Sequence, residues 1–175
     1  MEQVPGTEWT GEEERRVAIE KWTRGWRSGA NWFYWIAGLS VVNSAIALFQ
    51  GEWGFVVGLG ITQFFQALAQ AAGEQAGGVA LVLRLLGMAL ALLAALVFVL
   101  FGWLANRGHG WAFVAGMVLY LLDGLIFLLV RDWLALGFHV FALFCIFAGY
   151  GALRKLREAQ APAPAESRPL GPGGA

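Results

Sequence analysis

The chain has 175 residues and no net formal charge, and 58% of its residues are hydrophobic whereas only 14% are charged. Because soluble domains carry about 25% charged residues, this composition excludes an ordinary soluble domain, and the absence of net positive charge argues against nucleic acid as a partner. Several apolar runs approach the length of roughly 20 residues that crosses the ~30 Å hydrocarbon core of a bilayer as a helix. We therefore expect an all-α fold: a polytopic membrane helical bundle, with the lipid bilayer as its main partner.

Residues 1–30 form a polar N-terminal region in which 12–28 open with acidic side chains and then become basic. This order of charges suits the helix macrodipole, and Trp22 and Trp26 stand four residues apart among the bases. The pattern predicts an amphipathic interfacial helix whose indoles lie among lipid headgroups, although a solvated helix that leads into the membrane fits it equally well. The region does not resemble a cleavable signal peptide, so we expect the first membrane helix to act as the insertion signal.

Residues 31–151 form the predicted membrane bundle, in which short polar connectors separate five apolar segments. Tryptophans stand near the segment ends, as is typical of the aromatic belts at the two membrane interfaces. The connectors are short, so consecutive segments should pack antiparallel. The five predicted helical segments cover residues 32–49, 55–72, 79–104, 111–130 and 133–150.

The second segment is the weakest candidate for a membrane crossing because Gln63, Gln66 and Gln70 interrupt it. These three side chains fall on one face of a helix, and Asn43 belongs to a matching polar stripe on the first segment. We expect the two stripes to form hydrogen bonds between helices; a polar path through the bundle is the less simple alternative.

The basic residues favour an even number of crossings. If the second segment does not cross, all of the twelve basic residues except Arg84 and Arg131 lie on one side, as the positive-inside rule requires for two cytoplasmic termini. With five crossings this bias nearly vanishes. Four and five crossings therefore both remain open.

Residues 152–175 form the third region. The sequence RKLRE continues the last helix as a basic turn that can meet anionic lipid headgroups, and the Pro- and Gly-rich remainder is typical of a disordered tail. The excess of Arg over Lys, together with many Ala and Gly residues, is typical of GC-rich bacterial genomes. We therefore expect a multi-pass protein of the bacterial inner membrane.

Asp123 and His139 are the most informative residues for function, since ionisable side chains within apolar segments are costly in hydrocarbon. They stand at nearly equal distances from the turn at 131–132, roughly 12 Å along each helix. An antiparallel hairpin would therefore bring them to the same depth. Tyr120 lies on the same helical face as Asp123, so we expect an Asp123–His139 contact to which Tyr120 adds a hydroxyl group.

This pair has two interpretations. It can bind or transfer a proton or cation, or it can form a structural hydrogen bond that locks the hairpin, which we consider the better explanation. A third hypothesis makes His139 the single axial ligand of a haem or chlorophyll-type pigment. A bound metal ion would need three or four ligands, and no Cys/His/Glu cluster accompanies His139, so we expect no metal site and no other cofactor.

No catalytic motif accompanies these residues. We therefore expect a non-enzymatic integral membrane protein that serves as an accessory or assembly component, either as a homo-oligomer or as a subunit of a membrane complex. The alternative is a small transporter or channel that uses the Asp123/His139 pair to handle protons or cations.

Overall fold

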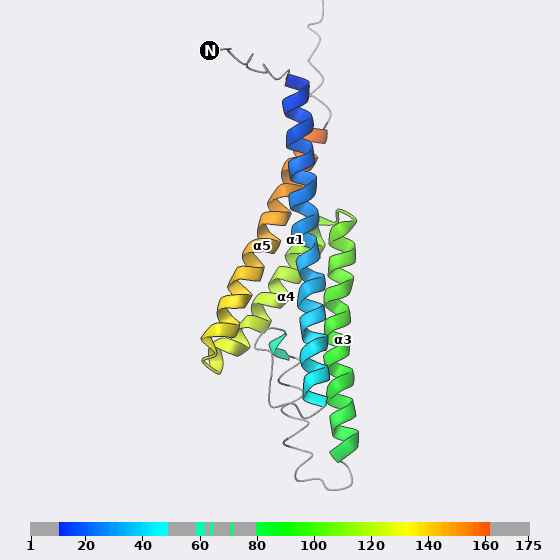
Figure 1. The fold of residues 1–175 in the computed structure, drawn as a ribbon, viewed down its shortest axis with the longest axis vertical. Coiled ribbons are helices and arrows are strands. Elements are labelled where there is room, and N and C mark those ends of the chain that lie inside the picture. Colours follow the sequence, from blue (N-terminus) through cyan, green and yellow to red (C-terminus); the bar gives the residue numbers. More distant parts are fainter. Residues whose placement is uncertain (1–10, 49–58, 62–63, 65–70, 72–79, 162–175) are drawn as a thin grey trace, which may run out of the picture.

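The computed structural model describes residues 11–48, 59–61, 64, 71 and 80–161. Long helices account for nearly all of them (Figure 1), which confirms the prediction of an all-helical fold. Three of these helices contain stretches long and apolar enough to cross a membrane, namely Leu85–Asn106, Gly110–Leu129 and Trp133–Gln160. The long helices are α1 (Gly11–Leu48), α3 (Ala80–Asn106), α4 (Gly110–Leu129) and α5 (Trp133–Gln160).

The sequence analysis separated an interfacial helix over 12–28 from an apolar segment over 32–49, whereas the structure joins them in α1. Nothing between the two stretches stops a helix: Gly29 and Ala30 are both buried in the helical bundle. At 1.5 Å per residue, 38 residues span about 57 Å, which exceeds the hydrocarbon thickness by far. The charged N-terminal half of α1 therefore extends along the end of α5, where Arg15 donates to the Ala159 carbonyl at 2.7 Å. A separate interfacial helix and a total of five helices are not confirmed.

Glycines bring α1 and α5 into backbone contact. A Cβ atom placed on Gly29 would lie 2.4 Å from the Cα atom of Gly149, and a Cβ atom on Gly25 would lie 3.3 Å from Ala152. Gly25 and Gly29 form a GxxxG pattern, the arrangement that lets membrane helices approach most closely. The rotation of α5 about its own axis is therefore fixed against α1.

Two tight turns connect α3, α4 and α5. Between α3 and α4, Gly108 has a φ of +85°, a conformation that favours glycine. Between α4 and α5, Asp132 caps the next helix by accepting a hydrogen bond from the Ala135 amide at 3.1 Å. Both connections are as short as the sequence predicted, so consecutive helices run in opposite directions.

The α4–α5 hairpin diverges from the α1–α3 pair toward the end of the bundle that holds the Arg131 turn (Figure 1). Residues 59–61 lie in the angle between the two pairs, where they contact α1 and α4. Helix α1 begins and α5 ends at the opposite end of the bundle, whereas α1 ends and α3 begins at the end where the pairs diverge (Figure 1). The chain between α1 and α3 thus leaves and re-enters the bundle at the same end.

Aromatic rings fill the centre of the bundle. Phe33 of α1 is fully buried and lies 6.0–6.3 Å, between ring centroids, from Phe98, Phe101 and Phe113. Its ring occupies the space above Gly116, where a Cβ atom would approach to 2.5 Å. This aromatic contact couples α1 to both α3 and α4.

We expect Gly149→Ala to destabilise the folded protein by about 2 kcal/mol, because the added methyl group would force α1 and α5 apart in a well-packed contact. Gly137→Ala is the matched control on the same helix, since a Cβ atom there meets nothing within 4 Å. Unfolding of the purified protein in detergent, followed by circular dichroism, measures the difference. Equal stability of the two variants would show that the glycine contact is not a determinant of the fold.

Candidate functional site

The structure brings Asp123 of α4 and His139 of α5 into direct contact across the last hairpin. The Nε2 atom of His139 lies 3.0 Å from Oδ2 of Asp123, and both residues are buried, with 6% and 1% of their surfaces exposed. Gly124 makes room for this contact, because a Cβ atom there would lie 3.2 Å from Cδ2 of His139. The two side chains thus meet at the common depth that their distances from the turn predicted.

The Asp123 carboxylate also binds two backbone amides from a different part of the chain. Oδ2 accepts from the Gly60 amide at 2.7 Å and Oδ1 accepts from the Ile61 amide at 2.8 Å. Gly60 and Ile61 are helical and follow the non-helical Leu59, so the carboxylate binds amides at a helix start, where negative charge is favourable. A side chain at Gly60 would collide with Phe127, since a Cβ atom would lie 2.8 Å from that ring.

Ser40 of α1 holds the same short segment from the opposite side. Its hydroxyl oxygen accepts from the Leu59 amide at 2.8 Å and donates to the Ile36 carbonyl of its own helix. Residues 59–61 are therefore fixed between α1 and α4 by their backbone amides, with Leu59 fully buried. Three consecutive N–H groups that would be costly without partners in a membrane each have an oxygen partner.

The hydrogen bonds leave a single proton to be placed between Asp123 and His139. Nδ1 of His139 lies 2.9 Å from the Ala135 carbonyl, which can only accept, so Nδ1 carries a hydrogen atom. The contact between Nε2 and Oδ2 requires one further proton, bound either to the imidazole or to the carboxyl group. The pair is neutral overall in both states, which is the condition for burying it away from water.

Two aromatic rings of α4 enclose the imidazole of His139. Tyr120 stacks on it with the ring centroids 4.3 Å apart and the planes inclined by 17°, and Phe127 lies 4.9 Å away. The hydroxyl group of Tyr120 is buried and makes no hydrogen bond within the described part of the chain, so Tyr120 meets the pair through its ring and not through its oxygen.

An apolar hollow of about 410 Å³ opens between α3 and α4 beside this site. Its lining includes Phe98, Leu119 and Ile126, and Asp123 is the polar residue among the side chains that form it. The hollow faces the side of the bundle on which Leu119 and Leu122 are exposed. It gives the carboxyl group an approach from the apolar side and not a water-lined path.

The structure describes only one of the four residues predicted to form polar stripes. Asn43 is buried on α1, three residues beyond Ser40, so the polar stripe of the first segment does face the bundle interior. Gln63, Gln66 and Gln70 lie outside the described residues. The predicted proton- or cation-binding role of Asp123, His139 and Tyr120 stays a prediction, although the structure does bring the three side chains together.

Sequence reasoning missed the partners that give Asp123 its role in the fold. Every residue except proline has a backbone amide, so the sequence does not reveal that the amides of Gly60 and Ile61 bind Asp123. Only the glycines of the sequence GLGIT indicate that the backbone of this segment can approach another helix closely. Ser40 lies three residues before Asn43, on the same polar face of the first segment, but the sequence does not identify the Leu59 amide as its partner.

His139 does not offer a nitrogen atom to a tetrapyrrole in this arrangement. Nε2 faces Asp123, Nδ1 faces the Ala135 carbonyl, and the ring lies between Tyr120 and Phe127. The described residues also contain no group of three or more His, Cys, Asp or Glu side chains that could hold a metal ion. Both ring nitrogens of His139 thus have hydrogen-bonding partners within the described residues.

Comparisons of this chain with protein-family models, with curated proteins and with solved structures give no match.

Proposed function

We propose that this protein is a non-enzymatic multi-pass membrane protein that serves as an accessory or assembly component of a membrane complex. The observation that carries the proposal is that the Asp123 carboxyl group accepts from two backbone amides and also contacts Nε2 of His139, so both of its oxygen atoms have partners within the fold. A carboxylate in this state acts as a structural clamp for residues 59–61. To bind an ion, Asp123 would have to give up backbone partners that hold residues 59–61 in place.

The clamp makes sense in a protein whose role is to present a fixed shape. It joins the α4–α5 hairpin to α1 through the short segment in the angle between them, and so it fixes the spread of the two helix pairs. Fixed lateral surfaces are what a partner subunit, or a second copy of this chain, needs in order to pack within a bilayer. The large exposed leucine and valine side chains of α3 and α4 supply such surfaces.

We further propose four crossings, with both termini in the cytoplasm of a bacterium and the bundle in its inner membrane. Support comes from the common end at which α1 begins and α5 ends (Figure 1). Arg107, Arg154 and Arg157 lie at this same end, whereas Arg131 lies at the other, in agreement with the positive-inside rule.

A second candidate function is proton or cation handling by Asp123 and His139. Two observations favour it: one proton with two possible positions inside the pair, and the hollow between α3 and α4 that reaches the carboxyl group. In this alternative, the proton moves between oxygen and nitrogen when Asp123 exchanges its amide partners for a transported ion.

We expect Asp123→Asn to lower the stability of the folded protein by about 2 kcal/mol, because the new NH₂ group faces a buried amide and leaves it without an acceptor. Hydrogen–deuterium exchange should rise in peptides that contain residues 59–61, while peptides from the first three turns of α1 stay unchanged. The matched control is Asp132→Asn, which removes the same charge nearby but keeps a good helix cap. Unchanged exchange at residues 59–61 would contradict the clamp.

The same two variants separate the clamp from the transporter in reconstituted vesicles. The clamp predicts that wild type and Asp123→Asn give equal proton and sodium flux under an imposed pH gradient, measured with an internal pH-sensitive dye. A wild-type flux that exceeds that of empty vesicles and disappears in Asp123→Asn, but not in Asp132→Asn, would favour the transporter.

The proposed topology predicts that reporter domains fused before α1 and after α5 both lie in the cytoplasm. Alkaline phosphatase should be inactive, and green fluorescent protein fluorescent, at each position in a bacterial host. An active phosphatase at only one terminus would require an odd number of crossings and would exclude the four-crossing arrangement.

A further inference from the structure

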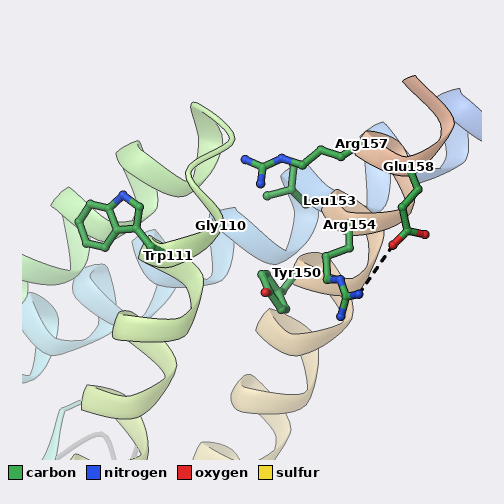
Figure 2. A pocket seen from close by; sticks show the side chains of 7 residues that line it. All are labelled: Gly110, Trp111, Tyr150, Leu153, Arg154, Arg157 and Glu158. Atoms are coloured by element: carbon green, nitrogen blue, oxygen red, sulfur yellow. Dashed lines mark ion pairs between the residues drawn. The ribbon is translucent and has the colours of Figure 1, made fainter. Parts of the chain in front are cut away.

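A second hollow, of about 370 Å³, lies at the end of the bundle where α5 ends (Figure 2). It is formed between the start of α4, at Gly110 and Trp111, and the last three turns of α5, at Tyr150, Arg154 and Arg157. It lies far from the Asp123–His139 pair, near the opposite ends of the same two helices. An inference about this hollow therefore goes beyond the proposed function and does not depend on the clamp.

Two arginines and one glutamate, Glu158, line this hollow, so its charged side chains carry a net positive charge. Arg157 reaches from α5 across to the start of α4 (Figure 2), where its guanidinium donates to the Gly108 carbonyl. Its Nη1 atom would lie 3.5 Å from a Cβ atom placed on Gly110. Arg154 forms only a long contact of 3.7 Å with Glu158, and both side chains are about two-thirds exposed, at 65% and 68%. An exposed pair of this kind is weak, so Arg154 is available to an incoming anion.

The aromatic residues place the hollow at the level of the membrane interface. Trp103 and Trp111 are exposed on the bundle surface, and Arg107 lies over the ring of Trp103 at 3.7 Å. Trp and Tyr side chains concentrate where the hydrocarbon of a bilayer meets its headgroups. The apolar stretch of α4 starts at this level, so the two arginines stand where lipid phosphates lie.

We propose that this hollow binds the phosphate group of an anionic membrane lipid. Arg154 and Arg157 bind the phosphate oxygens, for which the planar guanidinium is well suited. Tyr150 contacts the glycerol and the first carbons of the acyl chains. The start of α4 adds to the attraction, because His109 supplies no side-chain cap to its amides.

The test is native mass spectrometry of the full-length protein titrated with phosphatidylglycerol, with phosphatidylcholine as the lipid without net charge. The double variant Arg154→Gln/Arg157→Gln should lose about tenfold in phosphatidylglycerol affinity, because it removes both guanidinium groups that line the hollow. Lys155→Gln is the matched control, since Lys155 is exposed on the same turn of α5 but does not line the hollow. It should change the affinity by less than about twofold.

A second variant keeps every charge and fills the hollow instead. A leucine in Gly110→Leu would project between Tyr150 and Arg157, because a Cβ atom there lies 3.4 Å from the tyrosine ring and 3.5 Å from the guanidinium. The Gly110→Leu variant should bind phosphatidylglycerol more weakly than the wild type does, with phosphatidylcholine binding unchanged. Its unfolding temperature in detergent should also be unchanged. Equal losses in the arginine double variant and in Lys155→Gln, or wild-type binding by Gly110→Leu, would overturn the proposal.

Soluble anions distinguish a lipid from a free phosphate. Millimolar inorganic phosphate and glycerol phosphate should not displace bound phosphatidylglycerol, because they lack the acyl chains that Tyr150 contacts. If inorganic phosphate displaced bound phosphatidylglycerol at the same concentration as added lipid does, the assignment of the hollow to a lipid headgroup would be overturned.

Discussion

The burial of one carboxylate inside the bundle is the constraint on which the rest of this structure depends. In hydrocarbon, a negative charge needs partners, and a backbone amide outside a regular helix needs an acceptor. Asp123 meets both needs at once, because it accepts from the Gly60 and Ile61 amides and shares a proton with His139. His139 in turn requires Gly124 opposite its ring, so the small residue on α4 follows from the charge.

The same interaction helps to fill the space between the two diverging helix pairs. Leu59, Gly60 and Ile61 lie in this space, beside the apolar hollow between α3 and α4. Ser40 holds the segment on one side and Asp123 on the other, through adjacent amides. Loss of either oxygen would release the segment from one pair, so shape and hydrogen bonding are not separable in this part of the bundle.

Much of this arrangement could be predicted from the sequence, and the remainder could not for physical reasons. The apolar runs predict α3, α4 and α5 because their lengths match a bilayer, and the equal distances of Asp123 and His139 from a tight turn predict their contact. The sequence left the continuity of α1 open, because charge and hydropathy change within this helix although the helical backbone continues. The amides of residues 59–61 were missed because a side-chain pattern carries no information about backbone partners supplied by a distant segment.

The contact between Gly29 and Gly149 connects the two ends of the bundle. Residues His139, Ile146, Gly149 and Leu153 belong to one buried stripe of α5, so a single rotation of this rigid helix places them all. The close approach of the backbones at Gly149 fixes that rotation, since a turn of even one residue would drive a side chain into α1. His139 is thereby directed at Asp123 ten residues earlier, and Tyr150 is directed at the start of α4 one residue later. The Gly29–Gly149 contact therefore determines both the orientation of His139 toward Asp123 and the shape of the arginine-lined hollow, although the two sites differ in their chemistry.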